Sequence, residues 1–289
     1  MKFSFVRKPL VASVVAACAA LAALPAGAAD WSDTYLGYRY GTKFREPFNN
    51  EDITKNILSL THASGYKYGT NFFNVDFLMS DSKDPSNANS STGAQEAYIV
   101  YRNTVDAGKV MGKDLKTGPV RGWGGTFGFD VNAKTDAGYN SKKRMLVLGP
   151  TAMFDVPGFL NVSVLALWES NAPCNTFTNT CTPRYTYKTH PALTGAWGIP
   201  FGESGFSFEG FVLFIAAKGK DEFGAQTKPE TNFDGQVMYD VGRLVGPKNT
   251  FKVGLEYQWW KNKFGNDASG PAGSGAFAKT PMIRAEYHF

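Results

Sequence analysis

His62 and Ser64 have the residue types of a nucleophilic enzyme, because a serine activated by a nearby histidine is a common arrangement in covalent catalysis. The two residues have the same parity and lie next to a short break at residues 63–65, so a strand would place both on one face beside a tight turn. A three-residue motif arises often by chance, and His190 and His288 have no serine or acid at a suggestive spacing. We therefore expect no enzymatic activity, and a lipid hydrolase is the weakest of the alternatives.

The stretch GWGGTFG, residues 122–128, superficially resembles a glycine-rich phosphate loop. A phosphate loop also needs a Lys-Ser/Thr pair and a following helix, and both are missing here. Glycine inside a strand more often marks close packing or a bend. No group of metal ligands stands out in the sequence either, so we expect neither a cofactor nor a metal.

The N-terminal residues have the pattern of a secretory signal peptide. Lys2, Arg7 and Lys8 form a basic region, residues 10–24 form an apolar run, and the Ala-Gly-Ala of residues 26–28 fits the small-x-small cleavage rule. We therefore predict a cleaved signal peptide at residues 1–28 and a single domain at residues 29–289.

Export changes how the charges and the cysteines are interpreted. The chain has 30 Lys+Arg against 25 Asp+Glu, and cleavage removes three of the basic residues, so the mature chain is nearly neutral and its charge does not indicate a nucleic-acid partner. Cys174 and Cys181 lie in a polar stretch of an exported chain. They predict one disulfide that closes a short loop.

Apolar and polar side chains alternate with period two along most of the mature chain. In residues 250–263, Phe251, Val253 and Leu255 alternate with Lys252 and Glu256. Successive side chains of a strand point to opposite faces, so such a strand has one apolar and one charged face. The same pattern recurs at residues 71–79, 123–134, 233–241 and 282–289.

Strand length and aromatic placement favour a membrane barrel over a soluble sandwich. The alternating segments are about 9 to 14 residues long, as tilted membrane strands are, whereas globular strands centre on about 5 to 6 residues. Their apolar stripes often end in Trp or Tyr, as in the aromatic girdles at a bilayer interface. We predict an all-β fold: a transmembrane antiparallel up-and-down β-barrel of about twelve strands in the bacterial outer membrane. The strands are expected to start near Trp31, Lys55, Tyr66, Gly93, Val120, Ser141, Phe159, Arg184, Gly205, Thr231, Thr250 and Thr280.

The connectors mostly alternate between short and long, which is typical of short periplasmic turns and longer extracellular loops. Two connectors depart from this alternation, at residues 103–119 and 135–140. The final stretch, MIRAEYHF, must pair with the first strand, because a membrane sheet leaves no edge open. An alternating segment that ends in Phe289 also resembles the signature by which outer-membrane proteins engage their insertion machinery.

The polar faces of these strands would line the lumen and mix both signs of charge with aromatic rings. Phe72 and Trp260 would stack on a planar ring, and Arg39, Asp76 and Asp130 would meet polar groups, which suits a small polar solute with little net charge. The alternative is a set of structural ion pairs that stiffen the barrel without any specificity for a ligand.

Two stretches, YRYGTKFREPFNN onward (residues 38–85) and DVNAKTDAGYNSKKRMLVLGPTAMF (residues 130–154), resemble the nucleoside-specific, Tsx-like family of outer-membrane porins, as a divergent branch. The resemblance implies a monomeric twelve-stranded barrel with a narrow slot, where nucleosides diffuse along weak sites that pair aromatic with ionisable side chains. Carried over to this chain, the candidate site residues are Tyr35, Arg39, Phe44, Glu46, Asp52, Lys55, Phe72, Asn74, Asp76, Asp130, Lys142 and Arg144.

The expected function is passive, weakly selective diffusion of nucleosides and similar small polar solutes. The expected partners are these solutes, outer-membrane lipid and lipopolysaccharide, with phage or toxin docking on the loops as the family resemblance implies. A non-selective small porin and a loop-based surface receptor remain alternatives. A general porin normally has more strands and forms trimers.

Overall fold

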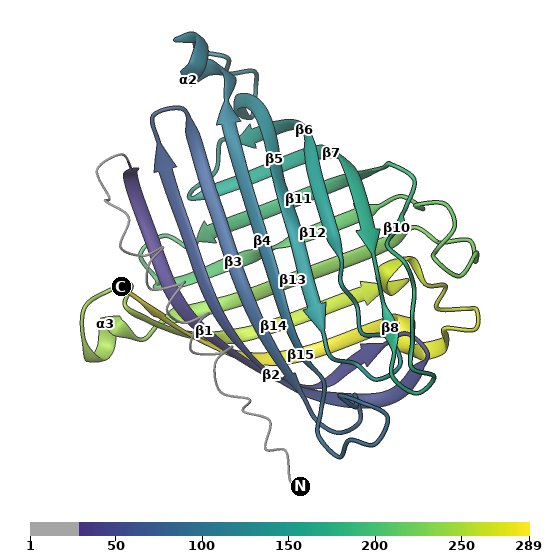
Figure 1. The fold of residues 1–289 in the computed structure, drawn as a ribbon. Coiled ribbons are helices and arrows are strands. Elements are labelled where there is room, and N and C mark those ends of the chain that lie inside the picture. The colour runs from purple at the N-terminus through teal and green to yellow at the C-terminus, as the bar shows by residue number, and fades with distance from the viewer. Residues whose placement is uncertain (1–28) are drawn as a thin grey trace, which may run out of the picture.

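The computed structural model describes residues 29–289, and the predicted signal peptide at residues 1–28 lies outside them. Twelve long antiparallel strands close into a barrel, as predicted (Figure 1). In chain order they are β1 (Ala29–Glu46), β2 (Asn49–Tyr66), β3 (Gly69–Ser80), β4 (Gln95–Asp106), β5 (Val120–Lys134), β6 (Arg144–Phe154), β7 (Phe159–Asn171), β11 (His190–Pro200), β12 (Phe206–Ile215), β13 (Glu230–Asp240), β14 (Phe251–Lys261) and β15 (Phe277–His288).

The smaller elements all lie in the connectors. Cys174 and Cys181 are joined by a disulfide across the short β8–β9 hairpin. In the described part of the chain no helix is long and apolar enough to cross a membrane. These elements are β8 (Cys174–Asn175), β9 (Thr180–Cys181), β10 (Tyr185–Thr186), α2 (Ala107–Met111), α3 (Gly242–Val245), η1 (Lys263–Gly265) and η2 (Gly273–Ala276).

The first and last strands seal the barrel. β1 and β15 pair in an unbroken register from Tyr35 opposite His288 to Gly41 opposite Met282. Beyond that register, the backbone N–H of Phe289 donates to the carbonyl of Thr34 at 3.0 Å. The alternating C-terminal segment is therefore held by a strand from the other end of the chain, and the sheet has no open edge there.

Burial along the strands is the reverse of that in a water-soluble protein. On β14, Leu255 is 70% exposed, whereas its neighbour Glu256 is 2% exposed. On β5 the aromatic rings of Trp123 and Phe127 lie outside, and the hydroxyl of Thr126 between them is buried. Apolar side chains outside and polar side chains inside are what a barrel needs when lipid surrounds it.

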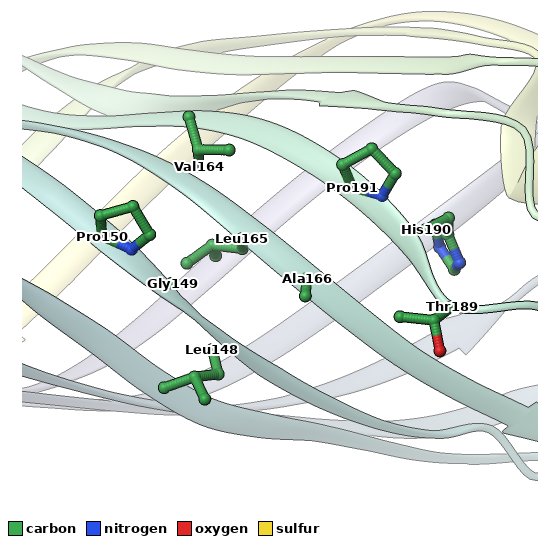
Figure 2. A pocket seen from close by; sticks show the side chains of 9 residues that line it. All are labelled: Leu148, Gly149, Pro150, Val164, Leu165, Ala166, Thr189, His190 and Pro191. Atoms are coloured by element: carbon green, nitrogen blue, oxygen red, sulfur yellow. The ribbon is translucent and has the colours of Figure 1, made fainter.

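Two shallow grooves, of about 380 and 400 Å³, lie on this outer surface. The first crosses β6, β7 and the start of β11, where Gly149 and Ala166 leave a gap between the larger side chains of Leu148 and Val164 (Figure 2). Both grooves are lined mainly by apolar groups, which suits contact with lipid chains rather than with a polar solute.

The β1–β2 hairpin differs from its prediction. β2 was expected to begin near Lys55, but it begins at Asn49, and a two-residue turn at Pro47 and Phe48 joins two strands of 18 residues each. The prediction relied on alternating apolar residues, and residues 49–52 are all polar, so this part of the strand was not recognised. Two register irregularities between Gly41 and Glu46 accompany it, and such bulges bend a strand.

Apolar side chains also occupy part of the lumen face, in two clusters. One consists of Phe44, Ile53, Ile57 and Met282 on β1, β2 and β15, and the other of Met145, Val147, Leu165, Leu167 and Ala192 on β6, β7 and β11. All of these residues lie on the inward parity of their strands. The interior therefore contains apolar patches as well as charges.

Candidate functional site

Two arginines and three carboxylates form a connected ion-pair network in the lumen, here called the arginine layer. Arg39 Nη2 lies 2.5 Å from Asp76 Oδ2, and Arg39 Nη1 lies 3.4 Å from Glu256 Oε1. Arg284 Nη1 lies 2.7 Å from Glu256 Oε2, and its Nε lies 2.6 Å from Glu286 Oε1. The layer joins β1, β3, β14 and β15, whose inward parity brings these side chains together.

Neutral side chains add hydrogen bonds to the arginine layer, although the buried Arg39 Nε has no partner among the described residues. Arg39 Nη2 donates to Ser59 Oγ at 3.2 Å, Arg284 Nη2 donates to the Tyr35 hydroxyl at 3.2 Å, and Asn74 Nδ2 donates to Asp76 Oδ1 at 3.0 Å. Buried charges are tolerated when they are paired and hydrogen-bonded in this way. The layer is therefore a fixed polar surface inside the barrel.

Two further carboxylates on neighbouring strands have weaker cationic compensation. Asp234 on β13 accepts a hydrogen bond from Gln258 Nε2 at 3.0 Å, which is a neutral partner. Glu209 on β12 accepts one from Ser207 Oγ at 2.6 Å, while Lys252 Nζ lies 3.9 Å away. We call Asp234 and Glu209 the acidic pair.

A second charged cluster closes the extracellular end, and we call it the mouth cluster. Lys55 Nζ lies 2.7 Å from Glu46 Oε1, and Lys134 Nζ and Lys263 Nζ each lie 3.3 Å from the same oxygen. Lys134 Nζ also lies 3.0 Å from Asp84 Oδ2. Asp84 and Lys263 come from connectors, so the cluster ties two loops to the ends of three strands.

Burial and neighbouring charges shift pKa values in the connectors at this end. Burial lowers the pKa of the Lys263 ammonium, against the opposing effect of Glu46. Burial and the adjacent Asp84 carboxyl raise the pKa of Asp136 to about 6, although Lys134 Nζ lies 3.3 Å away. The pKa of Asp84 is lowered in spite of burial, mainly through Asp136 and Lys134.

A third set of charges lies across the lumen around Glu169. Lys218 Nζ lies 2.7 Å from Glu169 Oε1 and 4.1 Å from the centre of the Tyr187 ring. Lys143 Nζ lies 3.9 Å from the same Glu169 oxygen and 5.9 Å from the centre of the Tyr98 ring. Lys143 thus lies between β4 and β7, which are separated by two strands in the sheet.

One side of the lumen wall has a row of hydroxyl groups instead of charges. Thr104, Thr126, Thr151 and Ser163 follow one another across β4, β5, β6 and β7, and consecutive oxygens are 2.8, 2.6 and 2.7 Å apart. We call these four residues the hydroxyl row. Each oxygen can both donate and accept, so the row is self-satisfied.

Two phenylalanine rings on the inward face remain partly exposed. Phe72 is 40% exposed and shares its face with Asn74 and Asp76, and Phe211 on β12 is 37% exposed. Trp260, which was expected to offer a free ring, is engaged: its Nε1 donates to Glu230 Oε1 at 2.6 Å, and Lys263 Nζ lies 4.6 Å from the ring centre. The accessible rings are therefore those of Phe72 and Phe211.

Most of the predicted site residues fall into these networks. Tyr35, Arg39, Asn74 and Asp76 meet at the arginine layer. The structure places three more at the mouth, where Phe44 packs beneath the Glu46–Lys55 ion pair. Phe72 faces inward, and Asp130 lies 2.6 Å from the guanidinium of Arg102 and accepts from the Tyr98 hydroxyl at 2.9 Å.

Three predicted residues lie elsewhere. Asp52 is at the extracellular rim and pairs with Arg45 at 2.6 Å. Lys142 lies in a connector, with its Nζ 3.4 Å from Cys174 Sγ. Arg144 was expected in the lumen, but the structure places it on the outer face, exposed and opposite Val131, because the inward parity of β6 belongs to the odd-numbered residues.

The residues missing from the predicted site are of two kinds. Glu256, Arg284 and Glu286 follow the inward parity of their strands, and Lys143 is detectable by the same alternation with Met145. The connector residues Asp84, Lys218 and Lys263 have no periodic signal, so nothing in the sequence marks them as lumen groups.

Within the described residues, the side chains of His62 and Ser64 are not hydrogen-bonded to each other. Both lie on the outward parity of β2, and the His62 Nδ1 is 2.8 Å from the hydroxyl of Thr34. Among the described residues no group of three or more His, Cys, Asp or Glu is arranged to hold a metal ion.

A closed barrel with a lipid-facing apolar surface and a polar lumen defines the class: this chain is an outer-membrane β-barrel protein. Searches of family models and of curated proteins each found no match.

Among solved structures the chain is similar to a KdgM porin, at 10% identity and a TM-score of 0.42, covering 88% of this chain and 99% of that one. It is also similar to the translocator domain of the autotransporter NalP from Neisseria meningitidis, at 13% identity and a TM-score of 0.43, covering 96% and 94%. Salmonella typhi OmpF in complex with daunomycin matches at 12% identity and a TM-score of 0.35, covering 89% and 97%. Such values transfer no ligand or activity to this chain.

Proposed function

We propose that this protein is a passive, monomeric outer-membrane channel for nucleosides and similar small polar solutes. The observation that carries the proposal is the Phe72 ring, 40% exposed on the inward face and two residues from Asn74 in the arginine layer's hydrogen-bond network. A planar base stacks on such a ring, while the ribose hydroxyls bind amide and carboxylate groups. Weak contacts of this kind favour passage, since a solute that binds tightly does not leave.

The experiment is single-channel conductance of the refolded mature chain in a planar bilayer, titrated with adenosine, thymidine and a sugar of similar size. We expect a small conductance that falls saturably with the nucleosides and not with the sugar. A conductance indifferent to all three solutes would leave the barrel intact and favour a non-selective small porin.

Phe72→Ala tests the ring itself. Base–aromatic stacking contributes about 1–3 kcal/mol, so we expect nucleoside block to weaken roughly tenfold or more, with the open-channel current retained. Phe127→Ala is the matched control, because Phe127 is 44% exposed but faces outward on β5. Equal nucleoside block in the parent and in Phe72→Ala would remove Phe72 from the site.

A further inference from the structure

The arginine layer contains more carboxylates than cations. Asp76, Glu256 and Glu286 share two guanidinium groups, those of Arg39 and Arg284, and the imidazole of His288, 3.3 Å from Glu286 Oε2, has a carboxylate of its own in Asp33, 2.8 Å from its Nδ1. Asp76 also accepts from Asn74 Nδ2, and the ion pairs of Glu256 and Glu286 with Arg284 are themselves hydrogen bonds, which favours the charged form of all three carboxylates. The layer therefore presents a negative excess to the lumen.

The acidic pair adds to this excess. Asp234 has two side-chain partners, the neutral amide of Gln258 and the Glu256 carboxyl, and Lys252 Nζ lies 3.9 Å from Glu209, a long ion-pair distance. β12, β13 and β14 are consecutive neighbours in the sheet, and the two carboxylates lie on their inward faces. The negative groups are thus gathered on one stretch of wall next to the arginine layer.

The mouth cluster does not reverse the sign of the lumen. Its three lysines, Lys55, Lys134 and Lys263, face the carboxylates of Glu46 and Asp84. Glu96 lies beside them and accepts from Asn132 Nδ2 at 2.5 Å. Positive and negative groups are therefore nearly balanced at the mouth, and Lys143 and Lys218 are likewise matched by Glu169 and Glu230. A passing ion meets a negative field at the arginine layer and Glu209.

We propose that the channel conducts small cations in preference to anions, so that its solutes are uncharged or cationic. A lumen with low-dielectric walls focuses the field of its fixed charges, and rings of Asp and Glu select cations in other channels. This inference rests on the proposed channel function and adds to it the sign of the charge that the lumen admits.

The test is the reversal potential of the refolded mature chain in a potassium chloride gradient. We expect a sign that shows potassium to be more permeant than chloride. Glu209→Gln removes one negative charge with little change of shape, and it should lower the potassium-to-chloride permeability ratio by roughly twofold or more. Lys252→Gln should raise the ratio, because it removes the cation beside Glu209.

Asp114→Asn is the matched control, since Asp114 is exposed in the β4–β5 connector outside the strands, and it should leave the ratio unchanged. Chloride preference in the parent, or a ratio in Glu209→Gln equal to that of the parent, would overturn the cation preference. Those results would not contradict the proposed channel function. A correctly folded barrel that carries no current at all would instead overturn the channel proposal, and the cation preference with it.

Discussion

Glu46 holds three lysines at once, which makes it the most consequential single charge of the mouth cluster. Glu46→Gln would leave Lys55, Lys134 and Lys263 close together with one fewer countercharge. Removing one partner from a buried ion network costs about 3–5 kcal/mol, because the remaining charges stay buried and unpaired. We expect the free energy of unfolding in urea to fall by about this amount.

Glu51→Gln on the same hairpin provides the comparison for Glu46→Gln. Glu51 is exposed, and a surface substitution of this kind changes stability by about 0.5 kcal/mol or less. Equal unfolding free energies for the two variants would show that the mouth cluster contributes little to the fold.

At the scale of single residues, the sequence predicts whether a side chain faces the lumen or the lipid more accurately than it predicts the ion-pair partners of that side chain. Parity placed Arg39, Asp76 and Glu256 inside the barrel, where the structure has them. Parity has no information about height along the barrel, so it did not show that these three residues share one ion-pair network. The parity rule also applies only within strands, so it could not predict that Lys218, which lies in a connector, pairs with Glu169 inside the barrel.

The β5–β6 connector contains a group whose pKa should be visible in the pH dependence of stability. The pKa of Asp136 is raised to about 6 by burial and by Asp84, from an ordinary value of 3.8. The folded state therefore holds this proton more tightly than the unfolded state does. Its stabilising effect is fully present below about pH 3.8 and is lost as the pH rises through about 6.

We expect the stability of this connector to decrease between about pH 4 and 6, and we expect Asp136→Asn to abolish that decrease. The lowered pKa of Asp84 acts in the opposite direction, but its effect falls below this window. Hydrogen exchange of residues 134–144, measured across the window, is the readout. Asp114→Asn, at an exposed position in the β4–β5 connector, is the control. Identical pH profiles for the parent and Asp136→Asn would contradict the assignment.

At the scale of elements, the strands with one fully apolar face were predicted closely. β5 and β7 begin at Val120 and Phe159, as expected, because tightly alternating apolar residues mark their first positions. The prediction was less accurate where polar residues extend a strand above the membrane, as at Asn49 of β2. Hydrogen bonding continues there without the apolar signal on which the sequence pattern depends.

The whole barrel has its apolar surface outside, and this arrangement is testable with one pair of substitutions. Leu255, midway along β14, and Leu244, in α3 beyond the strands, are both 70% exposed. An arginine facing lipid near the bilayer midplane costs about 2–4 kcal/mol. We therefore expect Leu255→Arg to lower the unfolding free energy in lipid vesicles by about this amount and Leu244→Arg to have little effect. Similar losses in both variants would mean that exposure alone, without lipid, sets the cost.

Closure of the barrel was predictable from the sequence, because an alternating terminal segment in a membrane sheet needs a partner strand. The composition of its interior was not. The apolar patch around Ile53 and Met282 lies on the inward face, where alternation alone predicts polar groups. Such a patch forms because side chains from strands far apart in the sequence meet across the closed sheet.

The hydroxyl row has a directional property that follows from counting protons. Each of the four hydroxyls has one proton and can accept two hydrogen bonds, so the three links of the row use three of its four protons. A row in which every link is made therefore cannot offer protons outward at both ends, because only two protons would then remain for three links. Solute hydroxyls that meet Thr104 and Ser163 at the same time consequently find an acceptor at one end at least.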